Sequence, residues 1–379
     1  MNQLRDTHMK KVAINGRFLT QPATGVQRYA YELVSAWDAM LATGEIDMQR
    51  FRLEIIVPHF AKIATKFKHI TIRRVGVLSG NGWEQIELPW YTRGVFLFNP
   101  CNSGPLFKLN QAVTIHDAST FAVPYSYSFF FRMKYLVVLS VLAKTAQVVL
   151  TVSQFSKNEI MRYLHIRPEK IVVIPEGSDH FQKISPDLAV FKKYNIGEKP
   201  YLLTFGSNAL HKNSFILNRA SALLNFEELD FIVVGADSKG WFTSLRMSSA
   251  DIFKMLGYVT NAELKALYQH AVALIYPSFY EGFGLPPIEA MACGCPAIVS
   301  NTASLPEVCG DAALYFDPDQ PEDLAKKITK LICEPFCQEV LKKKGVQQAE
   351  KYLWDITARE TWKSLPIDNP SYQSRNRMV

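Results

Sequence analysis

The stretch SFYEGFGLPPIEAMACGCPAIV, residues 278–299, decides the fold of this chain. The apolar run 273–276 just before it predicts a short buried strand, and the Pro-Pro pair within it suits the first turn of a helix. Gly282 and Gly284 allow backbone angles that other residues avoid, so they predict a tight turn between strand and helix. A strand, a glycine-rich turn and a helix in this order indicate an α/β protein with parallel strands.

The same alternation of strand-like and helical patterns runs along the rest of the chain. Chains of this kind form parallel sheets covered by helices. At 379 residues, 48% of them hydrophobic, the chain is long enough for two such domains. A polar connector at 182–199 separates the two sets of strands, which we predict at 12–15, 112–115, 148–152 and 171–174, and then at 201–205, 231–234, 273–276, 297–300 and 313–316.

Two glutamates, Glu281 and Glu289, stand eight positions apart in the quoted stretch. The free N–H groups and the dipole at the start of a helix favour phosphate or the oxygens of a sugar. A carboxylate inside that helix, here Glu289, can accept charge-assisted hydrogen bonds from ribose hydroxyls, each worth about 1.5–3 kcal/mol. Taken singly, either glutamate could be a helix-end or solvated loop residue, but the combined pattern predicts a nucleotide site.

The segment resembles the Glu-x7-Glu signature of the retaining GT-B glycosyltransferases of family 4, the glycosyl transferases group 1. Residues 257–271 and 301–318 are also similar to the donor-binding half of that family, and the resemblance extends over nearly the whole chain. It implies that Glu289 binds the ribose and that Glu281 is a catalytic residue beside the transferred sugar. It further implies a set of donor-binding residues that includes Ser207, Val259, Phe283, Gly284 and Leu285.

The resemblance also implies the domain organisation. In the GT-B fold, two Rossmann-like parallel-sheet domains face each other across a cleft. We expect an acceptor-side domain at 1–180 and a nucleotide-sugar-binding domain at 181–351. The last segment, 352–379, is expected to hold a helix that crosses back to the first domain, followed by a tail.

A second donor-side candidate is Lys212, in a loop that follows the strand 201–205 and opens a helix. That position suits a phosphate, although the loop matches neither the dinucleotide G-x-G-x-x-G motif nor the P-loop. In the family this lysine binds the diphosphate and usually follows an arginine, but here His211 precedes it. Read alone, a lysine near a helix start is more often a surface residue.

In the first half, the loop 20–28 carries Gly25 at the mouth of a helix predicted at 26–41. The family usually has a glycine-rich turn here, whose amides approach the donor phosphate. Thr24 stands where a second glycine is common, so the expected contact depends on Gly25. A purely structural turn would explain this glycine nearly as well.

His116 and Asp117 follow the strand 112–115, at its carboxyl end. The resemblance places His116 against the transferred sugar as a catalytic residue, and Asp117 on the acceptor side or against the same ring. Capping of the turn is the structural alternative. Trp83 and Asn102 lie in segments similar to relatives that build bacterial surface polysaccharides, and we assign both to the acceptor side.

The first half of the chain carries the net positive charge. Residues 1–180 hold 21 Lys and Arg against 13 Asp and Glu, a net +8, whereas residues 181–379 hold 21 against 22, a net −1. We expect an anionic membrane surface or a phosphate-bearing acceptor there rather than nucleic acid, because no nucleic-acid-binding motif is present. Ordinary solvation of a basic surface is the alternative.

The cluster 129–135 alternates aromatic and cationic residues at the head of a helix, a pattern that suits a membrane interface. The simpler alternative is a helix that buries one face on its own sheet. The apolar run 135–143 is too short to span a bilayer, which takes about 20 residues. The start of the chain shows no apolar signal segment. We therefore expect a cytoplasmic protein, either soluble or peripheral on the inner face of the cytoplasmic membrane.

No metal or cofactor is predicted. The six cysteines lack paired C-x2-C spacing and the eight histidines are scattered, so no zinc site is indicated. Asp317 and Asp319 resemble a D-x-D metal motif, but they follow a predicted strand and precede Pro321, which favours a turn. The diphosphate would instead be stabilised by Lys212, backbone amides and a helix dipole.

The sequence thus predicts a retaining glycosyltransferase. It would move a sugar from a nucleotide-diphosphate sugar, with GDP-mannose marginally favoured, to a saccharide or lipid-linked saccharide in surface polysaccharide synthesis. Two alternatives stay open. A sugar-nucleotide epimerase on a similar frame would use the same pocket without an acceptor, and a non-catalytic module would only bind a glycan or lipid.

Overall fold

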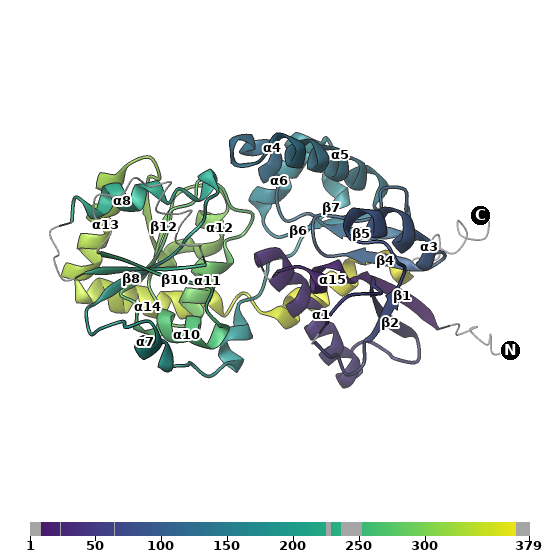
Figure 1. The fold of residues 1–379 in the computed structure, drawn as a ribbon, viewed down its shortest axis with the longest axis horizontal. Coiled ribbons are helices and arrows are strands. Elements are labelled where there is room, and N and C mark those ends of the chain that lie inside the picture. The colour runs from purple at the N-terminus through teal and green to yellow at the C-terminus, as the bar shows by residue number, and fades with distance from the viewer. Residues whose placement is uncertain (1–8, 23, 64, 225–228, 236–251, 369–379) are drawn as a thin grey trace.

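The computed structural model describes residues 9–22, 24–63, 65–224, 229–235 and 252–368. These residues form two α/β domains, which Figure 1 shows as two bodies side by side. Each domain has one parallel sheet covered by helices, so the fold class predicted from the sequence is confirmed.

The first domain is built on a seven-stranded sheet with the order β3-β2-β1-β4-β5-β6-β7. Every neighbouring pair is parallel. Its strands are β1 (Lys10–Asn15), β2 (Phe51–Pro58), β3 (Thr71–Val75), β4 (Phe96–Asn99), β5 (Gln111–Thr114), β6 (Val148–Thr151) and β7 (Ile171–Val173). Its main helices are α1 (Gly25–Thr43), α5 (Phe129–Thr145) and α6 (Gln154–Leu164), with short turns at α2 (Gly80–Gly82), α3 (Leu88–Tyr91) and α4 (Ser119–Ala122).

The second domain has a six-stranded parallel sheet with the order β10-β9-β8-β11-β12-β13. Its strands are β8 (Tyr201–Phe205), β9 (Asp230–Val234), β10 (Phe253–Gly257), β11 (Ala273–Tyr276), β12 (Ala297–Ser300) and β13 (Ala313–Phe316). Its helices are α7 (Ala189–Lys193), α8 (Phe215–Ser221), α10 (Asn261–His270), α11 (Leu285–Ala292), α12 (Leu305–Cys309), α13 (Pro321–Cys333) and α14 (Pro335–Ala349). In each sheet the chain adds strands first toward one edge and then toward the other, and the change occurs between β1 and β4 and between β8 and β11. Folds of this kind bind ligands at such a point.

The chain crosses between the domains twice. The first crossing follows β7 and includes the short helix η5 (Asp179–Lys183), and the second leads into α15 (Trp354–Ser364). Helix α15 packs on α1 of the first domain, and Ala358 O accepts a hydrogen bond of 3.0 Å from the Trp37 indole (Figure 1). The residues 369–379 of the expected tail lie outside the described part of the chain.

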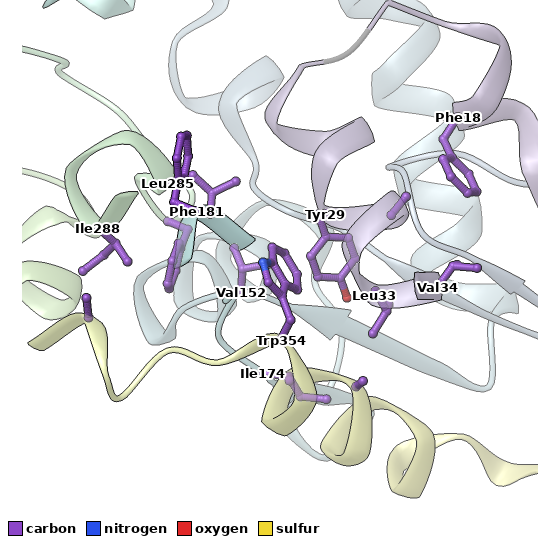
Figure 2. Close-up of a cluster of buried hydrophobic side chains, with 14 of the residues drawn as sticks. Phe18, Tyr29, Leu33, Val34, Val152, Ile174, Phe181, Leu285, Ile288 and Trp354 are labelled. Atoms are coloured by element: carbon purple, nitrogen blue, oxygen red, sulfur yellow. The ribbon is translucent and has the colours of Figure 1, made fainter. Parts of the chain in front are cut away.

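Apolar packing is continuous where the domains meet. Figure 2 shows Trp354 with Tyr29 on one side and Phe181 on the other, so side chains from both crossings and from α1 pack together. All three side chains are buried. This shared cluster fixes the base of the cleft and the position of the first turns of α1.

No helix in the described residues is both long enough and apolar enough to cross a bilayer. Helix α5 divides into two parts. Leu139, Leu142 and Ala143 in its second half are buried, whereas Phe129 and Phe130 at its start are exposed. The prediction that the helix packs on its own sheet therefore holds for the second half, and contact of the exposed first half with a membrane stays a prediction.

Candidate functional site

A cavity of about 480 Å³ lies between the two domains. It is lined from the first domain by the start of α1 and the residues after β5, and from the second by the ends of β8 and β11 and the start of α11. Carboxyl ends of parallel strands commonly hold ligands. Eleven of the residues proposed from the sequence line this cavity: Gly25, His116, Asp117, Ser207, Lys212, Val259, Glu281, Phe283, Gly284, Leu285 and Glu289.

The turn between β11 and α11 brings the domains into close contact. A Cβ on Gly282 would lie 2.6 Å from His116 O, so only glycine fits there. The Gly282 carbonyl accepts hydrogen bonds from Ser153 Oγ at 2.6 Å and Ser156 Oγ at 2.9 Å in the first domain. Gly284 has φ +99°, which other residues rarely adopt, and it starts α11 directly at the cavity.

Glu281 and Lys212 form an ion pair within the cavity, with Lys212 Nζ 2.7 Å from Glu281 Oε1. Burial disfavours the charged form of each residue, but the attraction to the opposite charge of its partner outweighs this effect. The pKa of Glu281 is therefore lowered and the pKa of Lys212 is raised. Lys212 also lies over the Tyr276 ring, at 5.8 Å from its centroid. Both groups are thus charged at neutral pH, with the lysine ready to contact an anion at the carboxyl end of β8.

Glu289 is buried in α11, with its carboxylate at the cavity wall. Tyr268 OH donates to Oε2 at 3.3 Å, while His180 Nε2 lies 3.1 Å and Arg28 Nε 3.6 Å from Oε1. Burial raises the pKa of Glu289, but the His180 contact and the Arg28 charge outweigh it and lower the pKa. An ionised carboxylate facing a cavity of this kind can accept hydrogen bonds from two neighbouring hydroxyls.

His116 is held on both sides within the first domain. Its Nε2 lies 3.0 Å from Pro100 O, which can only accept, and its Nδ1 lies 3.1 Å from Glu176 Oε1. Burial, partly offset by the hydrogen bond to His116, raises the pKa of the Glu176 carboxyl. The ring reaches the cavity, but both nitrogens already have partners, so a bond from His116 to a sugar would require one of them to be given up.

Asp117 lines the cavity beside Gly282, and its Oδ1 accepts a hydrogen bond of 2.8 Å from Ser119 N. It therefore stands where a sugar or an acceptor could meet it. One acceptor-side assignment, Trp83, needs correction. Trp83 is fully buried in the first domain and donates to Val75 O at 3.0 Å, so it cannot touch an acceptor. Asn102 uses its side chain to accept from His116 N at 2.7 Å, with φ +48°, and thus shapes the turn that holds His116.

The remaining donor-side candidates lie along the cavity. Gly25 starts α1, and a Cβ there would meet only Leu285 Cδ1 at 3.9 Å, so packing alone does not require a glycine. Ser207 Oγ accepts from Ala209 N at 3.2 Å. His211, which precedes Lys212, points instead toward the first domain, where its ring stacks on Tyr127 at 5.9 Å. This histidine does not replace the arginine usual at that position of the family.

Asp317 and Asp319 form a turn away from the cavity. Asp319 N donates to Asp317 Oδ1 at 3.0 Å, and Asp317 N donates to Asp323 Oδ2 at 3.0 Å. These bonds favour the structural reading of the D-x-D pattern. Within the described ranges, no cluster of three His, Cys, Asp or Glu side chains is arranged to hold a metal ion.

Sequence reasoning missed several residues of the site. Arg28 crosses the cleft from α1, and its guanidinium donates to Asn261 Oδ1 at 2.8 Å, close to Glu289. A basic residue one turn into the helix after the Gly25 loop was the available signal. His180 and Tyr268 lie behind Glu289. Their sequence neighbourhoods carry no sign of this, because only the packing of the two domains brings them there.

Comparisons with known proteins identify the relatives of this chain. The family model described as "Glycosyl transferases group 1" matches residues 188–348. The O-antigen chain mannosyltransferase B of Escherichia coli is 34% identical over 274 residues, which cover 68% of this chain and 72% of that protein. The O-antigen chain mannosyltransferase RfbU of Salmonella typhimurium is 33% identical over 234 residues, covering 60% of this chain and 62% of that protein.

Two solved structures share the whole fold. Anabaena HepE in complex with UDP-glucose superposes with a TM-score of 0.71 at 16% identity, covering 94% of this chain and 99% of that chain. WaaG, a glycosyltransferase involved in lipopolysaccharide biosynthesis, has a TM-score of 0.69 at 15% identity, covering 96% and 100%. These likenesses concern the fold, and they confirm the expected GT-B arrangement.

Proposed function

The chain belongs to the glycosyl transferases group 1 family and is a glycosyltransferase, and we propose that it moves a sugar from a nucleoside-diphosphate sugar to a saccharide acceptor in surface polysaccharide synthesis. The observation that carries this proposal is the meeting of Glu281, Lys212 and Glu289 at one cavity between the domains. In it, a buried carboxylate and a lysine both line the space that a nucleoside diphosphate would fill. The curated relatives named above act in O-antigen synthesis.

For the donor, GDP-mannose is our first candidate, since both curated relatives are mannosyltransferases. The ribose would bind Glu289, and the diphosphate would bind Lys212 together with the amides of 283–285 at the start of α11. Arg28 would add a second positive charge from the first domain. The base would lie near Val259 and Tyr258, which also line the cavity.

For the reaction, we propose transfer with retention of the anomeric configuration and without a metal. The acceptor would attack on the same face from which the nucleotide leaves, with Glu281 beside the sugar. The negative charge that develops on the diphosphate would be stabilised by Lys212 and the α11 dipole, an arrangement that acts through preorganised charges. The turn geometry of Asp317 and Asp319 supports a metal-independent site.

For the acceptor, we propose a lipid-linked saccharide at the inner face of the cytoplasmic membrane. Phe129 and Phe130 at the start of α5 are 68% and 84% exposed. Ile86 and Trp90 are also exposed, and Lys134 Nζ of α5 donates to Asn81 Oδ1 at 3.0 Å in the segment that precedes them. Exposed aromatic side chains flanked by cations suit the interface of an anionic bilayer.

One assay tests the proposal against its alternatives. The protein is incubated with GDP-mannose, UDP-glucose or dTDP-rhamnose, with and without a mannose-terminated oligosaccharide on an alkyl chain, in excess EDTA. We expect release of nucleoside diphosphate that rises with the acceptor, and a product whose anomeric configuration by NMR equals that of the donor. A new sugar nucleotide formed without acceptor would indicate an epimerase, and no turnover of any donor would indicate a binding module.

A further inference from the structure

The two connections between the domains interlock directly behind the donor cavity. Ser178 N donates to Tyr352 O at 2.9 Å, and Trp354 N donates to Asp179 Oδ1 at 2.7 Å. Gly177 lies so close to Trp354 that a Cβ there would fall 2.7 Å from its Cγ. The first and second crossings are therefore one packed unit, and Figure 2 shows Trp354 at its centre beside Phe181.

His180, which belongs to the first crossing, lies between Trp354 and Glu289. It is buried, and its Nδ1 lies 3.1 Å from Trp354 Nε1. An indole N–H can only donate, so Nδ1 must be the unprotonated nitrogen and the neutral ring carries its hydrogen on Nε2. That Nε2 lies 3.1 Å from Glu289 Oε1. Trp354 thus selects the tautomer in which His180 can donate toward the carboxylate.

The neutral His180 ring contacts the Glu289 carboxylate on the side away from the cavity and leaves its negative charge in place. His180 does not line the cavity, whereas Glu289 does. The Tyr268 hydroxyl donates a hydrogen bond of 3.3 Å to the other carboxylate oxygen, Oε2. The His180 N–H is not aimed squarely at Oε1, which therefore has no well-aligned partner among the described residues. Even with an N–H of His180 aligned on Oε1, the carboxylate would keep acceptor capacity for two ribose hydroxyls.

We propose that His180 is a positioning residue for donor binding, which fixes the Glu289 carboxylate against the ribose, and that Trp354 maintains it in the donating tautomer. The connections between the domains are then part of the donor site. This inference rests on the proposed function, because it takes the ligand of Glu289 to be a ribose.

Titration calorimetry with GDP and 2′,3′-dideoxy-GDP tests the proposal, since the second ligand lacks both hydroxyls that Glu289 would bind. In the wild-type protein, GDP should bind more tightly than the dideoxy analogue by about 10–100-fold or more. His180→Ala should weaken the binding of GDP by about 10-fold or more and leave the binding of the dideoxy analogue nearly unchanged, so that the two affinities converge. UDP and its dideoxy analogue replace this pair if UDP binds more tightly.

Three further variants separate positioning from packing. His180→Gln retains a side-chain N–H and should restore part of the preference for GDP. Trp354→Phe removes the indole N–H together with one of the two rings, and should lower that preference in the same direction but less than His180→Ala. His59→Ala, at an exposed histidine after β2, is the matched control and should change nothing.

The possible failures are distinguishable. If no nucleoside diphosphate binds the wild-type protein, the proposed function itself is wrong. Suppose that the wild type prefers GDP to its dideoxy analogue, but His180→Ala weakens the binding of both ligands equally or of neither. The proposed function then stands and the positioning role of His180 is wrong. If the wild type does not distinguish the two ligands, Glu289 does not hold the ribose and the inference is overturned.

Discussion

Lys212 Nζ lies 2.7 Å from Glu281 Oε1, although the two residues come from different strand ends of the second domain. Each holds the other in its charged form, as the lowered pKa of Glu281 and the raised pKa of Lys212 indicate. A diphosphate that takes Lys212 as its partner would leave Glu281 free beside the sugar. Under the proposed function, the pair would therefore link donor binding to the residue expected beside the transferred sugar.

Lys212→Ala should weaken the binding of a nucleoside diphosphate by about 10–100-fold, because a charge-assisted contact to phosphate is lost. Binding of the corresponding nucleoside should hardly change. Calorimetry with GDP and guanosine measures both. Lys327→Ala, at a lysine on α13 of the same domain, is the control. An equal loss for both ligands would instead mean that the variant is misfolded or that the phosphate lies elsewhere.

Glu281→Gln should destabilise the protein by about 1–3 kcal/mol at neutral pH, because it leaves the Lys212 charge partly buried without its partner. The folded pKa of Glu281 lies below its ordinary value of 4.5, so its contribution is present above that pH and lost as pH falls through the folded pKa. Lys212 has a folded pKa above 10.5, so its contribution is lost only as pH rises through that pKa. Thermal unfolding midpoints of the wild type and the variant should thus differ by a constant amount from about pH 6 to pH 9 and converge in acid. A difference that peaks below pH 4.5 would contradict the ion pair.

Glu307 of the second domain caps the start of α6 in the first. Its carboxylate accepts hydrogen bonds from Gln154 N at 2.7 Å and Phe155 N at 2.9 Å. Glu307→Ala should weaken this contact between the domains. The radius of gyration by X-ray scattering should therefore rise, and the donor KM should increase several-fold. Glu322→Ala, an exposed glutamate at the start of α13, should change neither. A closed, fully active Glu307→Ala protein would show that the bridge is dispensable.

Arg132→Glu with Lys134→Glu should reduce co-sedimentation with vesicles of phosphatidylglycerol, because each basic residue near an anionic surface contributes up to about 1 kcal/mol. Wild-type binding should fall as salt rises, with a salt-resistant remainder from the aromatic side chains. Lys342→Glu with Lys344→Glu on α14 is the charge-matched control. Equal sedimentation with neutral and anionic vesicles, or none, would favour a soluble acceptor.

The alternation of strands and helices was enough to predict two parallel sheets, because each predicted strand is a short apolar run between turn residues. Strands β2, β3, β4 and β10 were not named in advance. β3 is half exposed and carries two arginines, so it has no distinctive pattern. β4 is a buried apolar run as short as the strands that were predicted, so its Phe-Leu-Phe was a usable signal. β2 is almost continuously buried, as central parallel strands are, and its run of Ile and Val was a usable signal.

The site was less predictable than the fold. Glu281, Glu289 and Lys212 follow strand ends, so local pattern alone placed them at the correct edge of a sheet. Trp83 shows the limit of such reasoning, because an aromatic side chain in a motif can equally be core. The contacts of His180 with Trp354 and Glu289 join residues more than 100 positions apart, and only the packing of the two crossings creates them.

The kcat/KM of Glu289→Ala for the nucleotide-sugar donor tests the central claim most directly. Loss of two charge-assisted hydrogen bonds to the ribose, at about 1.5–3 kcal/mol each, should lower kcat/KM by about 10²–10⁴ while the variant stays folded. Circular dichroism and the thermal unfolding midpoint check the fold. A folded Glu289→Ala protein that turns over the donor as the wild type does would contradict the assignment of this cavity to a nucleotide.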